Sequence, residues 1–300
     1  MVVDRFERQV PFLTPEGQAR LASVRIAVVG VGGLGSHVVQ QLAYLGVTNL
    51  ALIDGDRIDG SNLNRLVTAT PGDVDTFKVE ALRRFVVTLH PGASVGVVRE
   101  ELRSAEAYVA VKGSDYLVGC VDDDGPRFLL AQLAAAYRKP YLDLSTEIGR
   151  DQTSYGGKIV FSRPGRGCIW CRGLLDEREI RDWLETPEER STRNRTYGQE
   201  PESEGGSGPS VVSLNGVVAS LGVMELMLEI AGVRPAVEFR EYKGAHGVVV
   251  LPKDYAADPE HCRFCREIVG RGDDADLARF IRERPRVAQC TGMKGANVGE

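Results

Sequence analysis

The stretch VRIAVVGVGGLGSHVVQQLAYLGVTNLALIDGDRIDGSNLNR, residues 24–65, decides the fold of this chain. Residues 24–29 form a β-branched, apolar run of the length expected for a strand buried on both faces. A glycine cluster follows, then a helical segment that ends at Gly46, and then a second apolar run, residues 49–53. The order strand, glycine turn, helix, strand predicts a doubly wound, Rossmann-like α/β sheet.

The glycines of the turn have the spacing typical of nucleotide-binding proteins. Gly30, Gly32 and Gly35 fit the G-x-G-x-x-G pattern, and Gly33 is an additional glycine. Glycines at these points permit a tight turn and let a phosphate approach bare backbone. The helix expected over residues 35–45 directs its free N–H groups and the positive end of its dipole at the same place. The turn therefore predicts an anionic, nucleotide-like ligand.

Polar residues after the second strand indicate which nucleotide is bound. Asp54 ends that strand, where a carboxylate can accept hydrogen bonds from ribose hydroxyls, and Asp56 follows it. Asn62, Arg65 and Lys78 then add an amide, a guanidinium and an ammonium group. Cations around a glycine turn suit the concentrated charge of a triphosphate better than the pyrophosphate of a dinucleotide. ATP is therefore expected, and an NAD-dependent oxidoreductase is the alternative.

A further expected strand, residues 115–121, ends in the three carboxylates Asp122, Asp123 and Asp124. Carboxylates at the carboxyl edge of a parallel sheet suit Mg²⁺, which prefers a few carboxylates together with phosphate oxygens. The alternative is that they cap the helix expected over residues 127–137.

Six motifs in order along the chain resemble the ubiquitin-activating-enzyme superfamily, and most closely its bacterial ThiF/MoeB/HesA-type adenylyltransferases. These enzymes activate small sulfur-carrier proteins for molybdopterin and thiamine synthesis. The resemblance covers about residues 4–270. The motifs are RFERQ at residues 5–9, GVGGLG, DGD, SNLNR, Lys78 and VDDDGPR at residues 121–127.

The resemblance implies a reaction, a partner and roles for particular residues. ATP and Mg²⁺ would serve to adenylate the C-terminal carboxylate of a small ubiquitin-like or sulfur-carrier protein that ends in Gly-Gly, with release of pyrophosphate. Arg65 and Lys78 would bind phosphate, and Asp122 would be required for catalysis and hold Mg²⁺. Arg8 would reach from one subunit of a homodimer into the ATP site of the other. Without the resemblance, the simplest interpretation of Arg8 is a solvated charge on the surface.

The sequence departs from the pattern of this family at two points. Asp123 stands where many members of the family have Asn, so a second carboxylate is expected to alter metal affinity or local pKa values. The polar segment 185–210, which in the family crosses over the substrate's tail, contains no cysteine to act as a nucleophile. The resemblance also leaves adenylation of a short peptide as an alternative, since relatives of this kind modify peptide antibiotics. A nucleotide-binding scaffold without catalysis is a further alternative.

Two C-x-x-C pairs predict a metal site. Cys168 and Cys171 lie about ninety positions before Cys262 and Cys265. Four thiolates at this spacing predict a tetrahedral, structural Zn²⁺ that staples the C-terminal extension to the domain. Redox pairs or disulfides are the alternative.

The domain organisation expected from these patterns has three parts. Residues 1–23 form an arm that contributes to the dimer site, residues 24–272 form the adenylation domain with the zinc site, and residues 273–300 form a helix and a flexible tail. Within the domain, residues 185–210 are polar and glycine-rich and are expected to be a mobile crossover loop. Cys290 in the tail is either the missing nucleophile or incidental.

Composition and the remaining patterns complete the expectation. The net charge of −5 argues against nucleic acid as a partner, and the charged start without an apolar run indicates a cytoplasmic protein. Residues 211–232 form a long apolar helix interrupted by Asn215, Glu225 and Glu229, which indicates a buried helix or dimer interface and not a membrane span. Further helices are expected over residues 15–21, 71–90 and 174–184, and further strands over residues 95–98, 139–144, 156–161, 239–242 and 248–251, the last three antiparallel.

Overall fold

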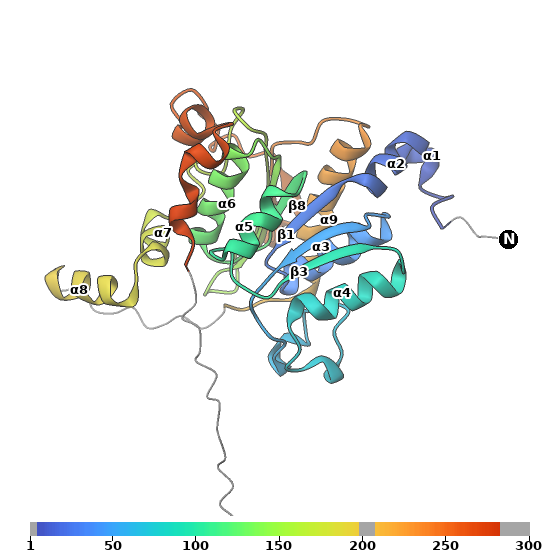
Figure 1. The fold of residues 1–300 in the computed structure, drawn as a ribbon, viewed down its shortest axis with the longest axis horizontal. Coiled ribbons are helices and arrows are strands. Elements are labelled where there is room, and N and C mark those ends of the chain that lie inside the picture. The colour runs from blue at the N-terminus through green and yellow to red at the C-terminus, as the bar shows by residue number, and fades with distance from the viewer. Residues whose placement is uncertain (1–4, 198–207, 283–300) are drawn as a thin grey trace, which may run out of the picture.

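A computed structural model describes residues 5–197 and 208–282 of the chain. One eight-stranded sheet has the order β3-β2-β1-β4-β5-β6-β7-β8 (Figure 1). The five parallel strands are β1 (Arg25–Val29), β2 (Asn49–Ile53), β3 (Ser94–Val98), β4 (Tyr116–Gly119) and β5 (Tyr141–Ile148). The antiparallel strands are β6 (Tyr155–Ser162), β7 (Phe239–Lys243) and β8 (Val248–Val250). The predicted Rossmann-like sheet and its antiparallel continuation are confirmed.

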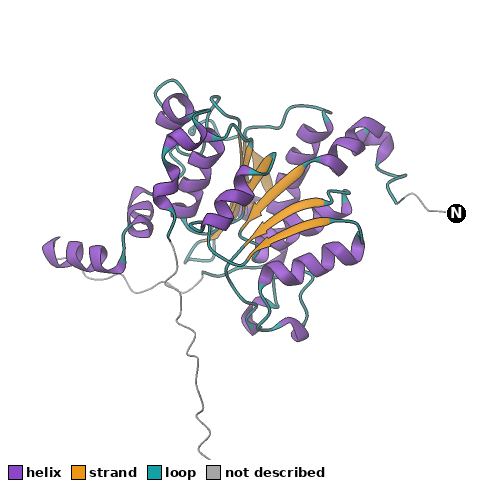
Figure 2. Cartoon of the chain, viewed as in Figure 1, coloured by secondary structure: helices purple, strands orange, loops and turns teal. Residues whose placement is uncertain are grey.

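Helices cover both faces of this sheet (Figure 2). One face packs against α2 (Pro15–Ser23), α3 (Gly33–Tyr44), α4 (Lys78–Leu89) and α9 (Val212–Ala231). The other packs against α5 (Ala105–Lys112), α6 (Asp124–Ala136) and the cysteine-bearing segments.

Strand β1 shows why the central strands are apolar at every position. Ile26 and Val28 belong to the core on one face, whereas Ala27 and Val29 belong to the core on the other. None of the four is more than 3% exposed. Because successive side chains point to opposite faces, a strand covered on both sides needs an unbroken apolar run.

The strand order reverses beside β1 and creates the place where a ligand can bind. From β1 the chain first builds β2 and β3 on one side, and then crosses to build β4 and β5 on the other. In such sheets a crevice opens beyond the carboxyl ends of the two strands at the reversal, here β1 and β4. The glycine turn follows β1 and the acidic run follows β4, so the topology brings both motifs to this crevice.

Helix α9 is a core helix, as one of the two sequence interpretations predicts. It packs on α3, β5 and β6, and an added Cβ at Gly222 would lie 2.5 Å from the Leu144 side chain. Among the described residues α9 is the one helix long and apolar enough to cross a membrane, yet 67% of that segment is buried inside the fold. Its apolar character is accounted for by this packing.

The expectation of a loop over residues 185–210 is wrong for its first half. Residues Pro187–Tyr197 form helix α8, which extends from the end of α7 (Glu177–Leu184) (Figure 1). The backbone N–H of Thr186 donates to the Glu189 carboxylate (2.7 Å), and the N–H of Glu189 donates to the Thr186 hydroxyl (3.2 Å). This reciprocal pair is a capping box that starts the helix. Residues 198–207 lie outside the described residues.

Three smaller features differ from the expected elements. Helices α1 (Val10–Leu13) and α5 have no counterpart among the predictions. In the described part of the segment expected to contain a C-terminal helix, the chain forms two 3₁₀ turns, Gly272–Ala275 and Leu277–Phe280, separated by Asp276 in a left-handed conformation (φ 52°). The expected tail from residue 283 on, including Cys290, lies outside the described residues.

Candidate nucleotide-binding site

The glycine turn is closed where it packs on protein and open where a ligand would approach. Gly30 has φ +80°, and an added Cβ there would lie 2.7 Å from the carbonyl oxygen of Cys120. An added Cβ at Gly35 would collide with the carbonyl oxygen of Gly30. At Gly32, in contrast, an added Cβ would meet no atom within 4 Å. The turn therefore presents bare backbone to open space at the N-terminus of α3, as a phosphate-binding turn requires.

Asp54 joins the end of β2 to the glycine turn. One carboxylate oxygen accepts the N–H of Val31 (2.8 Å) and the other accepts the N–H of Asp56 (2.9 Å). Burial raises the pKa of the Asp54 carboxyl, although the nearby charge of Lys78 acts in the opposite sense. Each oxygen retains a second lone pair, so the carboxylate is still able to accept hydrogen bonds from a ribose.

Lys78 and Asp56, both singled out from the sequence, form an ion pair. The ammonium nitrogen lies 2.7 Å from an oxygen of Asp56, and the Lys78 side chain is only 13% exposed whereas that of Asp56 is 72% exposed. The Lys78 N–H also donates to the Asp56 carbonyl (3.0 Å). The start of α4 is thereby held beside the end of β2.

Arg65 lies against the glycine turn. An added Cβ at Gly33 would lie 3.2 Å from the Arg65 stem, and the guanidinium donates to the Ser61 carbonyl (2.8 Å) and to the Asn64 side chain (3.2 Å). Asn62 accepts a long hydrogen bond from the Asp59 N–H (3.4 Å) and closes a capping box around a 3₁₀ turn. Asn62 therefore orders the loop that carries Arg65.

The three aspartates after β4 differ in environment. Asp122 is exposed and forms no hydrogen bond or ion pair with any other described residue. Asp123 occupies the N-cap position of α6, but its side chain makes no capping hydrogen bond, so capping does not account for these carboxylates. Desolvation, reinforced by the charges of Asp122 and Asp124, raises the pKa of Asp123. Asp124 is buried and paired with Arg127.

A buried ionic network lies behind the acidic loop, and Asp143 is a member of it that the sequence analysis missed. Arg127 donates to both oxygens of Asp143 (3.1 and 2.6 Å) and to Asp124 (2.5 Å). The hydroxyl of Tyr141 donates to Asp143 (2.7 Å). The signal was a carboxylate inside the apolar strand YLDL, because a carboxylate is found in a buried strand when it has a cationic partner.

Asn215 is a second residue that the sequence analysis did not assign to the site. It is 2% exposed, and an added Cβ at Gly33 would lie 2.5 Å from its amide nitrogen. Its amide donates to the Ser210 hydroxyl (3.1 Å), and its oxygen bonds the Thr146 hydroxyl (3.2 Å). The first turn of α9 therefore supports the glycine turn.

Arg8 does not lie at the crevice of its own chain. The side chains of Gln9 and Gln18 donate to the Leu45 carbonyl (3.2 and 3.0 Å), which anchors the N-terminal arm at the far end of α3 from the glycine turn. A helix of this length spans about 18 Å. Arg8 itself is exposed and has no partner among the described residues.

The four cysteines of the C-x-x-C pairs converge. All four sulfur atoms lie within 4.8 Å of one another, with Cys168 at 3.9 Å from Cys171 and 3.7 Å from Cys262. Sulfur atoms bound tetrahedrally at about 2.3 Å from a zinc ion would be about 3.8 Å apart. The observed spacing fits a Cys₄ metal site, with Cys265 as the fourth ligand.

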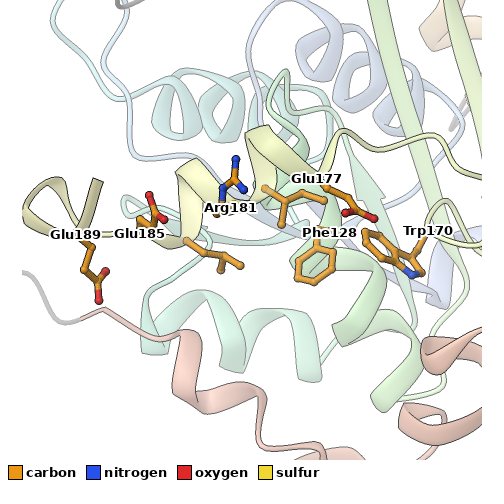
Figure 3. A pocket seen from close by; sticks show the side chains of 8 residues that line it. Phe128, Trp170, Glu177, Arg181, Glu185 and Glu189 are labelled. Atoms are coloured by element: carbon orange, nitrogen blue, oxygen red, sulfur yellow. The ribbon is translucent and has the colours of Figure 1, made fainter. Parts of the chain in front are cut away.

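A separate hollow lies beside the cysteine cluster, between α6, α7 and α8. Its volume is about 600 Å³, and Figure 3 shows Glu177 beside Phe128 and Trp170 at one end of it, with Glu185 and Glu189 at the other. Phe128 is one helical turn from Asp124, so the hollow adjoins the acidic loop but is distinct from the glycine turn. It is lined by Phe128, Trp170, Glu177, Ile180, Arg181, Leu184, Glu185 and Glu189.

Together the sheet reversal, the open glycine turn and the neighbouring cations and carboxylates are typical of the nucleotide-binding α/β proteins. Comparison with known families gives the assignment within that class. The chain belongs to the ThiF family, whose model matches residues 6–263.

Relatives with assigned names are similar over part of their length. The SAMP-activating enzyme E1 of Haloferax volcanii is 40% identical over 130 residues, which is 43% of this chain and 48% of that protein. The adenylyltransferase and sulfurtransferase uba4 of Aspergillus fumigatus is 34% identical over 172 residues, 56% of this chain and 35% of that protein. The chain thus spans less than half of the length of these relatives.

The fold also matches a solved structure. A crystal structure of E. coli MccB with AMPCPP and MccA superposes with a TM-score of 0.67 over 88% of this chain and 74% of that one, at 19% identity. At this identity the similarity shows a shared fold.

Proposed function

We propose that this protein adenylates the C-terminal carboxylate of a small ubiquitin-like or sulfur-carrier protein that ends in Gly-Gly, releasing pyrophosphate. Three observations support the proposal: the open turn at Gly32, the Lys78–Asp56 pair, and an exposed Asp122 carboxylate that has no partner in the part of the chain that the structure describes. The strand order brings all three to the carboxyl ends of neighbouring strands. Membership of the ThiF family and similarity to proteins named as an activating enzyme and an adenylyltransferase also support the proposal.

In the proposed reaction a carboxylate oxygen of the carrier attacks the α-phosphorus of ATP. The bond from that phosphorus to the pyrophosphate oxygen breaks, which leaves an acyl adenylate. The chain has to align the two reactants and to stabilise the charge that develops. We assign phosphate binding to the glycine turn, Arg65 and Lys78, and ribose binding to Asp54 with Asp56. Asn62 would order the loop that carries Arg65.

Mg²⁺ would be held by Asp122 together with phosphate oxygens. The residues present fit this ion, because Asp122 is exposed and has no other partner among the described residues. The ion would neutralise phosphate charge during the displacement. Asp123 would add negative charge to the same place and so strengthen metal binding.

The site would be complete only in a homodimer, with Arg8 of each subunit entering the ATP site of the other. The position of Arg8 at the far end of α3 supports this arrangement. So does an uncharged face on α3 and α9, where Tyr44, Val217 and Met224 are 58%, 38% and 47% exposed. These three side chains flank the hydrogen bond from Gln41 to Ser220 (3.0 Å), which joins the two helices. An exposed apolar face of this kind is typical of a subunit interface.

Zn²⁺ would occupy the cluster formed by Cys168, Cys171, Cys262 and Cys265, with no position left for a substrate. Its role would be structural. Trp170, between the first two cysteines, stacks on Phe264 (5.6 Å between ring centres) and contacts Phe128 of α6 edge to face (5.4 Å). The cluster would therefore fasten the C-terminal segment to α6. Four reduced thiolates also suit the cytoplasm, where we place the protein.

A short peptide is the second candidate substrate. The lack of a cysteine in residues 185–210 favours it, because the segment then offers no nucleophile to receive an activated carrier protein. In that case the same crevice would bind ATP, and a peptide would take the place of the carrier's tail.

ATP–pyrophosphate exchange with the purified protein tests the proposal. Exchange should depend on one small Gly-Gly-ending protein encoded in the same genome, and it should disappear in Asp122→Ala. Asp151→Ala, an aspartate whose carboxylate bonds Thr153 in an exposed turn, should retain it. Exchange only with short peptides would favour the second candidate. Thermal protection by NAD and not ATP would show an oxidoreductase, and protection by ATP without any exchange would show a scaffold.

A further inference from the structure

Helix α7 rests on Asp124, the last residue of the acidic run, and on Gly125, the residue after it. At its N-terminus, the N–H of Asp176 donates to an oxygen of Asp124 (2.6 Å). At its C-terminus, the indole of Trp183 lies directly on Gly125, where any added Cβ would overlap the ring. Both contacts fall on the first turn of α6, immediately after Asp122 and Asp123.

Asp124 is also linked to the interior of the sheet through Arg127. Asp124 shares Arg127 with Asp143, which is completely buried on β5. Asp124 thus accepts hydrogen bonds from the sheet side through Arg127 and from the helix side through Asp176. Such a fully satisfied buried network has one well-defined arrangement, because any displacement leaves a buried charge without its partner.

Helix α7 is itself held at its outer end. Arg103 donates to the Trp183 carbonyl (2.9 Å), and its guanidinium carbon lies 4.6 Å from the centre of the Trp183 ring. Beyond α7 the chain continues into α8, which is the first half of segment 185–210. Helix α7 is thus held at both ends, and its inner side contacts the residues next to the carboxylates predicted to hold the metal.

From these contacts we infer that α7 is a positioning element: seated on Asp124 and Gly125, it fixes the acidic loop for binding of a metal–nucleotide complex. Trp183 and Asp124 are its positioning residues, and neither contacts substrate in this role. The inference rests on the proposed function in one respect, namely that Asp122 holds the metal of MgATP.

Gly125→Ala in the full chain is the sharpest test. Alanine is favoured over glycine within a helix, so α6 itself should not weaken, whereas the new methyl group must displace Trp183. Gly92→Ala is the matched control, because an added Cβ there meets no atom within 4 Å. Asp124→Asn is an independent variant that keeps the shape but cannot accept from both Arg127 and Asp176.

Two readouts decide the outcome. Amide hydrogens of residues 117–127 should exchange faster in Gly125→Ala and Asp124→Asn than in the parent and in Gly92→Ala. The Mn²⁺ concentration that half-saturates the protein in the presence of a non-hydrolysable ATP analogue should rise about tenfold, the effect expected when the support of a metal ligand is lost.

Parent-like amide exchange in a folded Gly125→Ala protein would overturn the inference, and so would faster exchange with unchanged Mn²⁺ dependence. Failure of the parent protein to bind the metal–nucleotide complex would instead reject the proposed function. The amide exchange experiment would still decide whether α7 holds the loop, so the two failures are distinguishable.

Discussion

Gly32 and Gly35 belong to the same turn but are required for different reasons. An added Cβ at Gly35 collides with the Gly30 carbonyl, whereas one at Gly32 points into open space. We expect Gly35→Ala to destabilise the fold, and Gly32→Ala to cost about 1 kcal/mol of stability at most while weakening ATP binding at least tenfold. Denaturant unfolding measures the stability of both variants, and calorimetric titration measures the ATP affinity of Gly32→Ala. Parent-like ATP affinity in Gly32→Ala would show that phosphate binds elsewhere.

Motif spacing located the residues of the glycine turn, Asp54, Lys78 and Asp122, but not their supports. Asp143 and Asn215 lie in apolar segments, and each has a partner far away in the sequence, Arg127 at 16 positions and Thr146 at 69 positions. Which distant groups meet a buried polar side chain is decided by sheet order and helix packing. A polar residue inside an apolar run indicates that a partner exists, but only the fold shows which one it is.

At the scale of elements, the cysteine cluster joins β6 and the segment after β8 to α6. Removal of bound metal should therefore loosen this junction and leave the parallel half of the sheet formed. We expect the purified protein to contain zinc in an equimolar amount, and Cys262→Ser or chelation to lower stability by about 3 kcal/mol or more. Elemental analysis and thermal unfolding with and without chelator test this. A metal-free protein with full stability would contradict a structural metal.

Glu225 fastens the end of α9 to β7 through Arg234 (2.7 Å), Arg240 (2.9 Å) and the Val237 N–H (2.8 Å). Burial alone would raise the pKa of Glu225, but these hydrogen bonds and charges outweigh it and the pKa is lowered. A lowered carboxyl pKa contributes stability above the ordinary range of such groups, and that stability is lost as pH falls through the lowered value.

Glu225→Gln should accordingly reduce stability at neutral pH by about 2 kcal/mol, with a smaller loss in acid. The exposed Glu260→Gln is the control. Unfolding free energies measured from neutral pH down to pH about 3 would give this pattern. An equal loss at every pH would show that packing and not charge accounts for the effect.

Hydrophobic periodicity predicted the strands of the sheet and helix α9, because each buries a continuous apolar surface. It could not predict α8, which has almost no apolar face. The signal there was local: Thr186, Pro187 and Glu189 form a capping box with proline at the first helical position. The glycines further along the same segment favour a loop, and for this reason the whole segment was predicted to be one.

For the whole molecule, a site that is completed by Arg8 from the other subunit can be distinguished from a site formed within one chain. Arg8→Ala and Asp122→Ala should each be inactive alone. In a dimer that mixes the two variants, one site has neither change, so a refolded equal mixture should recover about a quarter of parental exchange activity. Sedimentation confirms that mixed dimers formed. No recovery in such dimers would place Arg8 in the site of its own chain or outside the site.

In the proposed reaction a carboxylate oxygen attacks the α-phosphorus of ATP, and the transfer of an oxygen isotope follows that bond. The carrier's C-terminal carboxylate is labelled with ¹⁸O, incubated with protein, ATP and Mg²⁺, and the product is cleaved with hydroxylamine. Hydroxylamine attacks the acyl carbon, so the oxygen that bridged carbon and phosphorus leaves with AMP. We predict AMP carrying one labelled oxygen and unlabelled pyrophosphate. Label in released orthophosphate, or unlabelled AMP despite turnover, would contradict the account.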